Sequence, residues 1–283
     1  MTAMSHPDRF VLAGVMGDPV MHSRSPRLHN YWLAKYGLSG TYVPLAITAG
    51  RLRAALRALP ALGFAGCNLT IPHKEAALDI VDQLDPLARR IGAVNCVVVG
   101  ADGALQGYNH DGFGYIESVR EAQPKWRGDT GPIVVVGAGG GARAVVAGLV
   151  DQGAREIRLV NRTPARGKAL AQELGGPIRT LGWNEREAAL EGAAMLINTT
   201  NQGMLGEPPL DLTLDRLPVS ALVSDIVYIP RETALLAAAR RRGNPTVNGL
   251  GMLLHQARPA FHAWFGIMPE VTPELRAMIE ATT

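Results

Sequence analysis

The 283-residue chain is poor in cysteine, in aromatic side chains and in long apolar runs. Its two cysteines, Cys67 and Cys96, exclude a disulfide framework and a zinc site of the Cys-x-x-Cys type, and they are typical of a reducing compartment. No apolar run approaches the roughly 20 residues that a membrane-spanning helix needs. Residues 1–9 lack the basic-then-apolar order of a signal peptide, so we expect a cytoplasmic protein.

The sequence also gives little support to a metal site or to nucleic-acid binding. The seven histidines are scattered, with neither a His-Glu-x-x-His arrangement nor clustered carboxylates. The formal net charge of +3 is only mildly basic. Its one run of cations, Arg240, Arg241 and Arg242, is typical of a solvated helix end. We therefore expect a small-molecule substrate, and no metal, nucleic acid or membrane partner.

What the chain does have is an alternation of apolar strand-like runs with helical patterns, which is typical of α/β proteins. The predicted strands cover 10–16, 42–47, 65–69, 94–99, 133–136, 157–160, 195–198 and 221–226. The polar stretch 118–132 suits a surface connection, with a domain boundary near it, and the tail is predicted to form helices over 252–265 and 273–281. The length allows one large or two ordinary domains.

The most informative stretch begins with the apolar residues 133–136 and continues as Gly137, Ala138, Gly139, Gly140, Gly141 and Ala142. It predicts a buried strand, a tight turn and a helix start, the pattern of a dinucleotide-phosphate site. Gly137 permits the turn, Gly139 lets the backbone approach a pyrophosphate, and Ala142 lets the helix pack on the strand. This pattern alone leaves a plain strand-to-helix turn open as the alternative.

A second strand over 156–160 ends in Asn161, Arg162 and Thr163, where such folds contact the adenosine ribose. The acidic residue that favours NAD is missing there. Arg162 and Arg166 offer planar donors to a 2′-phosphate, which favours NADP. The alternative is that both are ordinary solvated arginines at the start of a surface helix.

Hydroxyl and ionisable side chains gather in loops of the first half. Ser25 can cap the helix that Pro26 begins, whereas Ser23 has no such structural role, and together they could bind one carboxylate. Pro72 predicts the first turn of a helix over 75–84, which places Lys74 near the positive end of a helix dipole. That field would lower the pKa of Lys74 toward a useful proton donor or acceptor. The alternative is a lysine that extends into solvent.

Two further polar residues have two interpretations each. Asp111 could cap the helix that follows it, or it could pair with Lys74. Asn95 could shape a turn, or it could present its amide to a ligand.

Taken in order, eight blocks closely resemble the shikimate dehydrogenase family, including its quinate/shikimate relatives. The blocks are SRSP (23–26), NLTIPHK (68–74), GAVN (92–95), NHDG (109–112), the glycine turn (137–142), NRT (161–163), NTTNQGM (198–204) and GLGMLLHQ (249–256). The match covers nearly the whole chain, and eight ordered blocks are far more specific than any one of them.

The resemblance implies a two-domain α/β fold. An N-terminal substrate domain completed by the C-terminal helices would comprise 1–111 and 249–283, and a Rossmann-type NADP-binding domain would comprise 112–248. The implied protein is an NADP-dependent oxidoreductase, a monomer or homodimer. Its implied reaction is the reversible reduction of 3-dehydroshikimate to shikimate in aromatic amino-acid biosynthesis.

The resemblance also implies individual roles. Lys74 would exchange the proton at the C3 oxygen, and Asp111 would orient the ammonium and bind the same hydroxyl. The substrate would be bound by Ser23 and Ser25 at its carboxylate and by Asn68, Thr70, Asn95, Tyr228 and Gln256 elsewhere. NADP would be bound by the glycine turn, by Asn161, Arg162, Thr163 and Arg166, and by Ile226, Gly249 and Met252.

Two residues depart from the family pattern. His110 stands where the family usually has Thr, and Asn201 where Ser is common. They leave open a quinate/shikimate or aminoshikimate relative with altered substrate preference. A non-catalytic NADP-binding protein and a folate-interconverting dehydrogenase are further alternatives. The retention of both Lys74 and Asp111 argues against the first, and the paired serines with the 109–112 block argue against the second.

Overall fold

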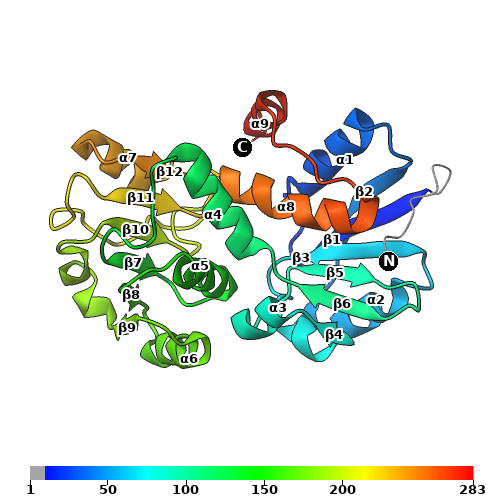
Figure 1. The fold of residues 1–283 in the computed structure, drawn as a ribbon, viewed down its shortest axis with the longest axis horizontal. Helices are drawn as coiled ribbons and strands as arrows, with labels where there is room; N and C mark the ends of the chain where they lie inside the picture. Colours follow the sequence, from blue (N-terminus) through cyan, green and yellow to red (C-terminus); the bar gives the residue numbers. More distant parts are fainter. Residues whose placement is uncertain (1–9, 283) are drawn as a thin grey trace. The chain divides into compact units, whose positions relative to one another are not determined.

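A computed structural model describes residues 10–282. Thr283 lies outside the described residues, as do residues 1–9, on which the expectation about a signal peptide rests. The chain forms two compact units (Figure 1). The first contains the residues up to His110 together with Gln256–Thr282, and the second contains Asp111–His255. The domain limits 1–111 with 249–283 and 112–248 stay a prediction, because compactness alone does not show which segments fold together.

The first unit is built on a six-stranded mixed sheet with the order β2-β1-β3-β5-β6-β4. Its strands are β1 (Val11–Gly17), β2 (Gly40–Ala46), β3 (Phe64–Leu69), β4 (Gln83–Leu84), β5 (Cys96–Val99) and β6 (Leu105–Tyr108). Its helices are α1 (Ser25–Lys35), α2 (Leu52–Ala58), α3 (Pro86–Ile91), α9 (Pro273–Glu280) and the second part of α8 (Leu250–Phe265). Strand β1 pairs in parallel with β2 and β3, whereas β5 runs antiparallel to β3 and β6.

Helix α3 shows how local sequence sets an element near the site. The Asp85 carboxylate accepts hydrogen bonds from the backbone N–H groups of Leu87 and Ala88, and Pro86 occupies the first turn. The helix ends at Gly92, whose φ of +70° is the left-handed conformation that glycine adopts without strain. This sharp end turns the chain directly into the segment that carries Asn95.

The second unit is built on a six-stranded sheet with the order β12-β11-β10-β7-β8-β9, in which every pair is parallel. Its strands are β7 (Ile133–Val136), β8 (Ile157–Val160), β9 (Ile178–Leu181), β10 (Met195–Asn198), β11 (Leu222–Asp225) and β12 (Thr246–Val247). Its helices include α4 (Asp111–Ala122), α5 (Gly140–Asp151), α6 (Pro164–Leu174) and α7 (Ala234–Arg242). The strand order reverses between β7 and β10, which is where open parallel sheets bind ligands. The predicted α/β fold with a Rossmann-type unit is confirmed.

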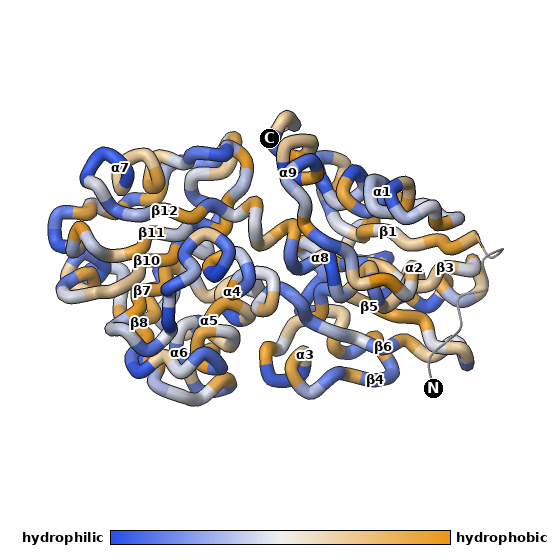
Figure 2. The backbone as a smooth tube through the Cα atoms, turned by 45° about the horizontal axis from the view of Figure 1, so that its top comes forward, coloured by the Kyte–Doolittle hydropathy of each residue, from blue (hydrophilic) through white to orange (hydrophobic). Residues whose placement is uncertain are grey.

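Strand β7 shows why the second unit was recognisable from sequence. All four of its side chains are buried, Ile133 and Val135 in one core cluster and Val134 and Val136 in another. Because helices cover both faces of a parallel sheet, a central strand is apolar without alternation. The strand is correspondingly drawn as hydrophobic in Figure 2.

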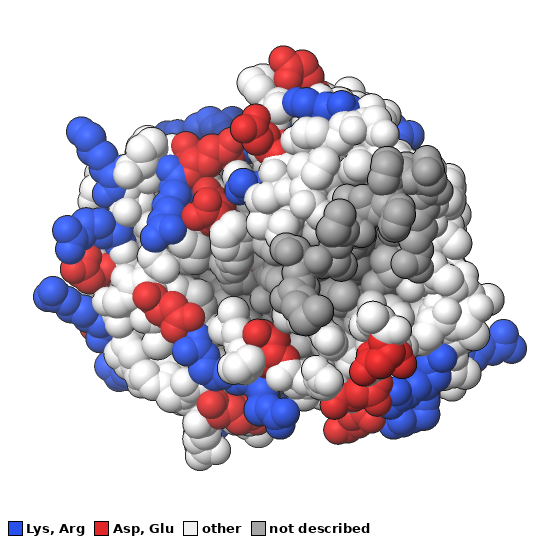
Figure 3. Space-filling view, turned by 45° about the vertical axis from the view of Figure 1, so that its right-hand side comes forward, with Lys and Arg blue, Asp and Glu red and all other residues white. Residues whose placement is uncertain are grey.

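The strands and tail helices were largely predicted. All eight predicted strands are present, and α8 and α9 confirm the two tail helices. The short strands β4, β6, β9 and β12 were not predicted, and α4 extends into the stretch that was expected to be a surface connection. None of the helices among residues 10–282 is both long and apolar enough to cross a membrane. On the face drawn in Figure 3, cationic and anionic side chains are interspersed.

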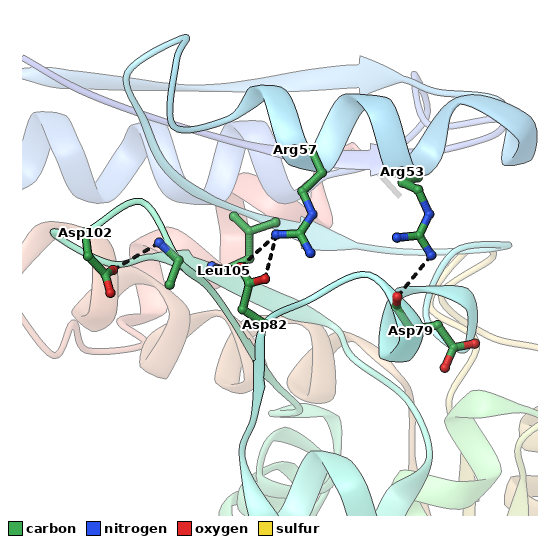
Figure 4. Close-up of polar contacts among 7 residues, drawn as sticks. Arg53, Arg57, Asp79, Asp82, Asp102 and Leu105 are labelled. Carbon is green, nitrogen blue, oxygen red and sulfur yellow. Dashed lines mark hydrogen bonds and ion pairs between the residues drawn. The ribbon is translucent and has the colours of Figure 1, made fainter.

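The helix predicted over 75–84 is wrong. The segment contains only a 3₁₀ helix, Ala76–Asp79, followed by β4. The Asp82 carboxylate accepts hydrogen bonds from Arg57 at 2.7 and 2.8 Å and from the Leu105 backbone at 2.8 Å (Figure 4). The Asp82 backbone also donates to the Leu105 carbonyl oxygen at 2.8 Å. These contacts hold the second half of the segment against β6, so the helix-dipole argument does not apply to Lys74.

The core of the first unit contains a buried histidine among aromatic rings. The imidazole of His29 stacks on Tyr42 with ring centroids 4.1 Å apart, and the rings of Trp32, Phe261 and Trp264 surround it. Neither ring nitrogen has a hydrogen-bond partner among residues 10–282. Burial lowers the pKa of His29 from 6.5 to about 3.

This histidine makes the stability of the chain depend on pH. The pKa of His29 is lower in the folded state, so the unfolded chain binds a proton that the folded chain excludes once the pH falls below about 6.5. We expect His29 to lower the free energy of unfolding by about 2 kcal/mol between neutral pH and about pH 5. Urea unfolding of the wild type and of His29→Phe at both pH values measures this. An equal acid loss in the variant would contradict it.

Candidate active site

Ser23 lies in the loop between β1 and α1, and Ser25 is the first residue of α1. The Ser23 hydroxyl oxygen accepts the backbone N–H of Ser25 at 3.3 Å. The prediction that Ser25 caps α1 is wrong, because Arg24 already has helical backbone angles at the N-cap and Ser25 is the first helical residue. Ser25 is buried, and the N-terminus of α1 has no side-chain cap hydrogen bond among the described residues.

The end of β3 carries Asn68, whose amide has a fixed orientation. The Tyr42 hydroxyl donates to Asn68 Oδ1 at 2.7 Å, and Asn68 Nδ2 donates to the backbone carbonyl of Asn95 at 3.0 Å. Thr70 follows the strand, and its backbone N–H donates to the Met16 carbonyl at 3.0 Å. Both predicted substrate residues therefore lie at the carboxyl end of the same strand.

Lys74 lies in a turn whose backbone is tied down on both sides. The Val94 N–H donates to the Lys74 carbonyl at 2.8 Å. His73 Nε2 donates to the Ile47 carbonyl at 2.7 Å, and the His73 backbone N–H donates to the Thr70 carbonyl at 2.9 Å. Because Val94 directly precedes Asn95, the Lys74 turn is fixed against the segment that carries that amide.

Asn95 shapes a turn, which confirms the first of its two interpretations, and the presentation of its amide to a ligand stays a prediction. Its Oδ1 accepts the backbone N–H of His110 at 2.9 Å, which shapes the turn after β6. Its Nδ2 lies 3.4 Å from Gln256 Oε1 on α8, as a donor in a longer hydrogen bond. The first unit thus brings together three predicted substrate-binding amides, those of Asn68, Asn95 and Gln256.

The glycine turn of the second unit has the geometry that the sequence predicted. Gly137 has a φ of +114°, and a Cβ there would lie only 2.6 Å from Thr199 Oγ1. Gly139 is the N-cap of α5, and a Cβ on it would meet nothing within 4 Å. Ala142 is fully buried, with α5 packed on the sheet. The backbone at the start of α5 is therefore open to a phosphate, with Ala138 and Gly140 in the same turn.

Ile226 joins two predicted cofactor segments. A Cβ on Gly141 would lie 3.0 Å from Ile226 Cδ1, so this side chain lies over the start of α5. A Cβ on Gly249 would lie 2.0 Å from the Ile226 carbonyl oxygen, so only glycine fits there. Met252, on α8, packs against the core of the same unit. The residues predicted to lie near the nicotinamide therefore gather beside the glycine turn.

The sequence assigned no role to two residues that shape this region. Asn198 Nδ2 donates to Asp225 Oδ1 at 3.1 Å. The Asp225 carboxylate also accepts the Val227 N–H at 3.0 Å and the Thr233 hydroxyl at 2.8 Å. Burial raises the pKa of Asp225, and these hydrogen bonds partly offset the rise. They hold the loop that carries Ile226 and Tyr228. The sequence did offer a signal for these two residues, because each is the polar last residue of an otherwise apolar strand.

The arginines predicted to bind a 2′-phosphate lie at the start of α6. Asn161 Nδ2 donates to the Thr163 carbonyl at 2.8 Å, which closes the turn ahead of the helix. Arg162 and Arg166 are exposed, and neither guanidinium has an ion-pair or hydrogen-bond partner within the described part of the chain. Both are therefore available to a ligand.

Asp111, the predicted partner of Lys74, is the first residue of α4 and belongs to the second unit.

No group of three or more His, Cys, Asp or Glu side chains within residues 10–282 is arranged to hold a metal ion.

Three segments match models of known protein families. Residues 15–97 match the shikimate dehydrogenase substrate binding domain, residues 121–205 match shikimate/quinate 5-dehydrogenase, and residues 249–281 match the shikimate 5'-dehydrogenase C-terminal domain. The chain is 56% identical over 268 residues to the shikimate dehydrogenase (NADP(+)) of Paramagnetospirillum magneticum, a match that covers 95% of this chain and 97% of the relative.

Solved structures agree with this similarity. The shikimate 5-dehydrogenase of Thermus thermophilus in complex with NADP(H) and shikimate is 34% identical, with a TM-score of 0.84 over 96% of this chain and 98% of that one. The quinate dehydrogenase of Corynebacterium glutamicum in complex with NAD is 31% identical, with a TM-score of 0.87 over 96% and 98% of the two chains.

Proposed function

The chain belongs to the shikimate dehydrogenase family, and on that premise we propose how its own residues divide the work of the reaction. It is an NADP-dependent oxidoreductase that interconverts 3-dehydroshikimate and shikimate, a step of aromatic amino-acid biosynthesis. The observation that carries our assignment of roles is the cluster of Asn68, Asn95 and Gln256 beside the anchored Lys74 turn.

The residues of the second unit fit NADP. The open backbone at Gly139 and the start of α5 would bind the pyrophosphate, because first-turn N–H groups have no partner within the helix. Arg162 and Arg166 would bind the 2′-phosphate, with Asn161 and Thr163 beside the ribose. Bound NADPH supplies the hydride that reduces the C3 carbonyl. Ile226, Gly249 and Met252 would form the surface against which the nicotinamide lies.

Lys74 would provide the proton at the C3 oxygen. As the carbonyl is reduced, its oxygen gains charge, and a positioned ammonium can donate a proton to it in the same step. Asp111 would orient the Lys74 ammonium and bind the same hydroxyl. In the oxidative direction Lys74 would accept the proton.

The remaining polar residues would hold the substrate. The hydroxyls of Ser23 and Ser25 would donate to its carboxylate. Asn68, Thr70, Asn95, Gln256 and Tyr228 would bind the ring and its hydroxyls. This set of side chains would bind a carboxylate and several hydroxyls at once, so it suits a polyhydroxylated cyclic acid. Such positioning contributes a large share of the rate, on the order of several kcal/mol.

The substrate preference can be tested by steady-state kinetics of the purified chain with shikimate and quinate, each with NADP and with NAD. We expect the highest kcat/KM with shikimate and NADP. Faster turnover of quinate with NAD would favour the quinate/shikimate alternative, and His110 and Asn201 are the departures to revert first.

We also assign the chain to the cytoplasm, as a monomer or homodimer. Cys67 and Cys96 are both buried free thiols, which suits a reducing compartment. Sedimentation equilibrium of the purified chain distinguishes the two assembly states.

A further inference from the structure

The Tyr42 hydroxyl is hydrogen-bonded to a residue that we assign to the substrate. It donates to Asn68 Oδ1 at 2.7 Å, and Asn68 is assigned to the substrate ring. Tyr42 itself belongs to none of the motifs that carried the resemblance.

The position of Tyr42 is fixed at its backbone and at its ring. Asn30 on α1 binds both backbone polar groups of Tyr42: its Oδ1 accepts the Tyr42 N–H at 3.0 Å, and its Nδ2 donates to the Tyr42 carbonyl at 2.9 Å. The phenol ring lies parallel to the His29 imidazole, with centroids 4.1 Å apart and an interplanar angle of 2°. Only 1% of the residue is exposed. So many constraints on one side chain exceed what strand pairing requires.

We propose that Tyr42 is a positioning residue, whose hydroxyl sets the orientation of the Asn68 amide for the substrate. The inference rests on the proposed function. A phenol has one donor hydrogen and two acceptor lone pairs. Its hydrogen goes to Asn68 Oδ1, which directs Asn68 Nδ2 to the Asn95 carbonyl. The second hydrogen of Nδ2 is then available to a substrate hydroxyl.

The phenol keeps its hydrogen for Asn68 Oδ1. Burial raises the pKa of Tyr42 well above its ordinary value, so the group remains a neutral donor. The neutral His29 ring supports the phenol without adding a charge.

Tyr42→Phe tests this role, because Phe keeps the ring against His29 and removes only the hydroxyl. We expect kcat/KM for shikimate to fall roughly tenfold, mainly through KM, with the Kd for NADP unchanged. The matched control is Tyr36→Phe. The Tyr36 hydroxyl also makes a hydrogen bond, accepting the Glu270 backbone N–H at 3.3 Å, and within residues 10–282 it hydrogen-bonds no assigned substrate residue. We expect this control to leave kcat/KM unchanged.

A double-mutant cycle separates positioning from a general structural effect. If Tyr42 acts through Asn68, Tyr42→Phe should cause a much smaller loss in the Asn68→Ala background than in the wild type. Equal losses in both backgrounds would overturn the proposal. If Tyr42→Phe does not fold, Tyr42→Met takes its place in the same cycle, because methionine adapts to the space and also lacks a hydroxyl, and equal losses in both backgrounds would again overturn the proposal.

Different results would contradict the proposed function and the role of Tyr42. A wild-type chain that does not oxidise shikimate with NADP would contradict the proposed function, and this inference with it. An active wild type whose Tyr42→Phe variant matches Tyr36→Phe would overturn the role of Tyr42 alone.

Discussion

Lys74→Ala is expected to lower kcat for shikimate oxidation by at least about a hundredfold, because general acid–base catalysis commonly contributes that much or more. The variant removes the proposed proton acceptor but none of the residues assigned to NADP. The Kd for NADP should therefore stay unchanged. Steady-state kinetics gives kcat, and fluorescence titration with NADPH gives the cofactor affinity.

The matched control for this experiment is Lys35→Ala. Lys35 is in the last turn of α1, with its ammonium 6.0 Å from the centre of the Tyr31 ring, and it has no assigned role in the reaction. The Lys35→Ala substitution removes the same charge from the same unit, and the variant should retain full activity. An unchanged kcat in Lys74→Ala would refute the assignment. A parallel loss of NADP affinity would show that Lys74 acts on the fold.

Arg162→Asp is expected to weaken NADP binding by roughly a hundredfold and to leave NAD binding nearly unchanged. The substitution removes a planar donor for the 2′-phosphate and puts a carboxylate in its place. That carboxylate repels the phosphate but can accept the 2′-hydroxyl of NAD. Titration of both cofactors into both proteins measures the ratio of affinities.

Arg179→Asp serves as the control for net charge, because Arg179 is an exposed residue of β9 in the same unit. It should change the affinity for NADP only slightly. Equal losses for NADP and NAD in Arg162→Asp would show that Arg162 acts structurally. Equal effects of the two substitutions on NADP would show that only long-range charge is felt.

Much of the second unit could be predicted because its information is local. The apolar run of β7 and the turn at Gly137 together specify strand, turn and helix start, and the structure has all three. By contrast, the segment 75–84 has helical periodicity, but its conformation depends on the contacts of Asp82. Arg57 and Leu105, remote in sequence, bind that carboxylate and draw the chain into β4. Local pattern cannot anticipate such contacts.

The residues of the candidate site also differ in how far local sequence could predict them. The cofactor residues come from motifs that are continuous in sequence. The cluster of Asn68, Asn95 and Gln256 joins β3, the turn before β5 and α8, so only the family resemblance pointed to it. Tyr42 was missed because a tyrosine in an apolar strand resembles ordinary core. Its hydroxyl acquires a role only when β2 and β3 lie in one sheet.

The central claim is that Lys74 and Asp111 act together on one substrate oxygen. A crystal structure of the chain with NADP and shikimate bound tests it most directly. We predict that Lys74 Nζ and an Asp111 carboxylate oxygen each lie about 2.6–3.2 Å from the C3 oxygen of shikimate. A complex in which the ammonium points into solvent, or in which the carboxylate is out of reach of that oxygen, would contradict the account.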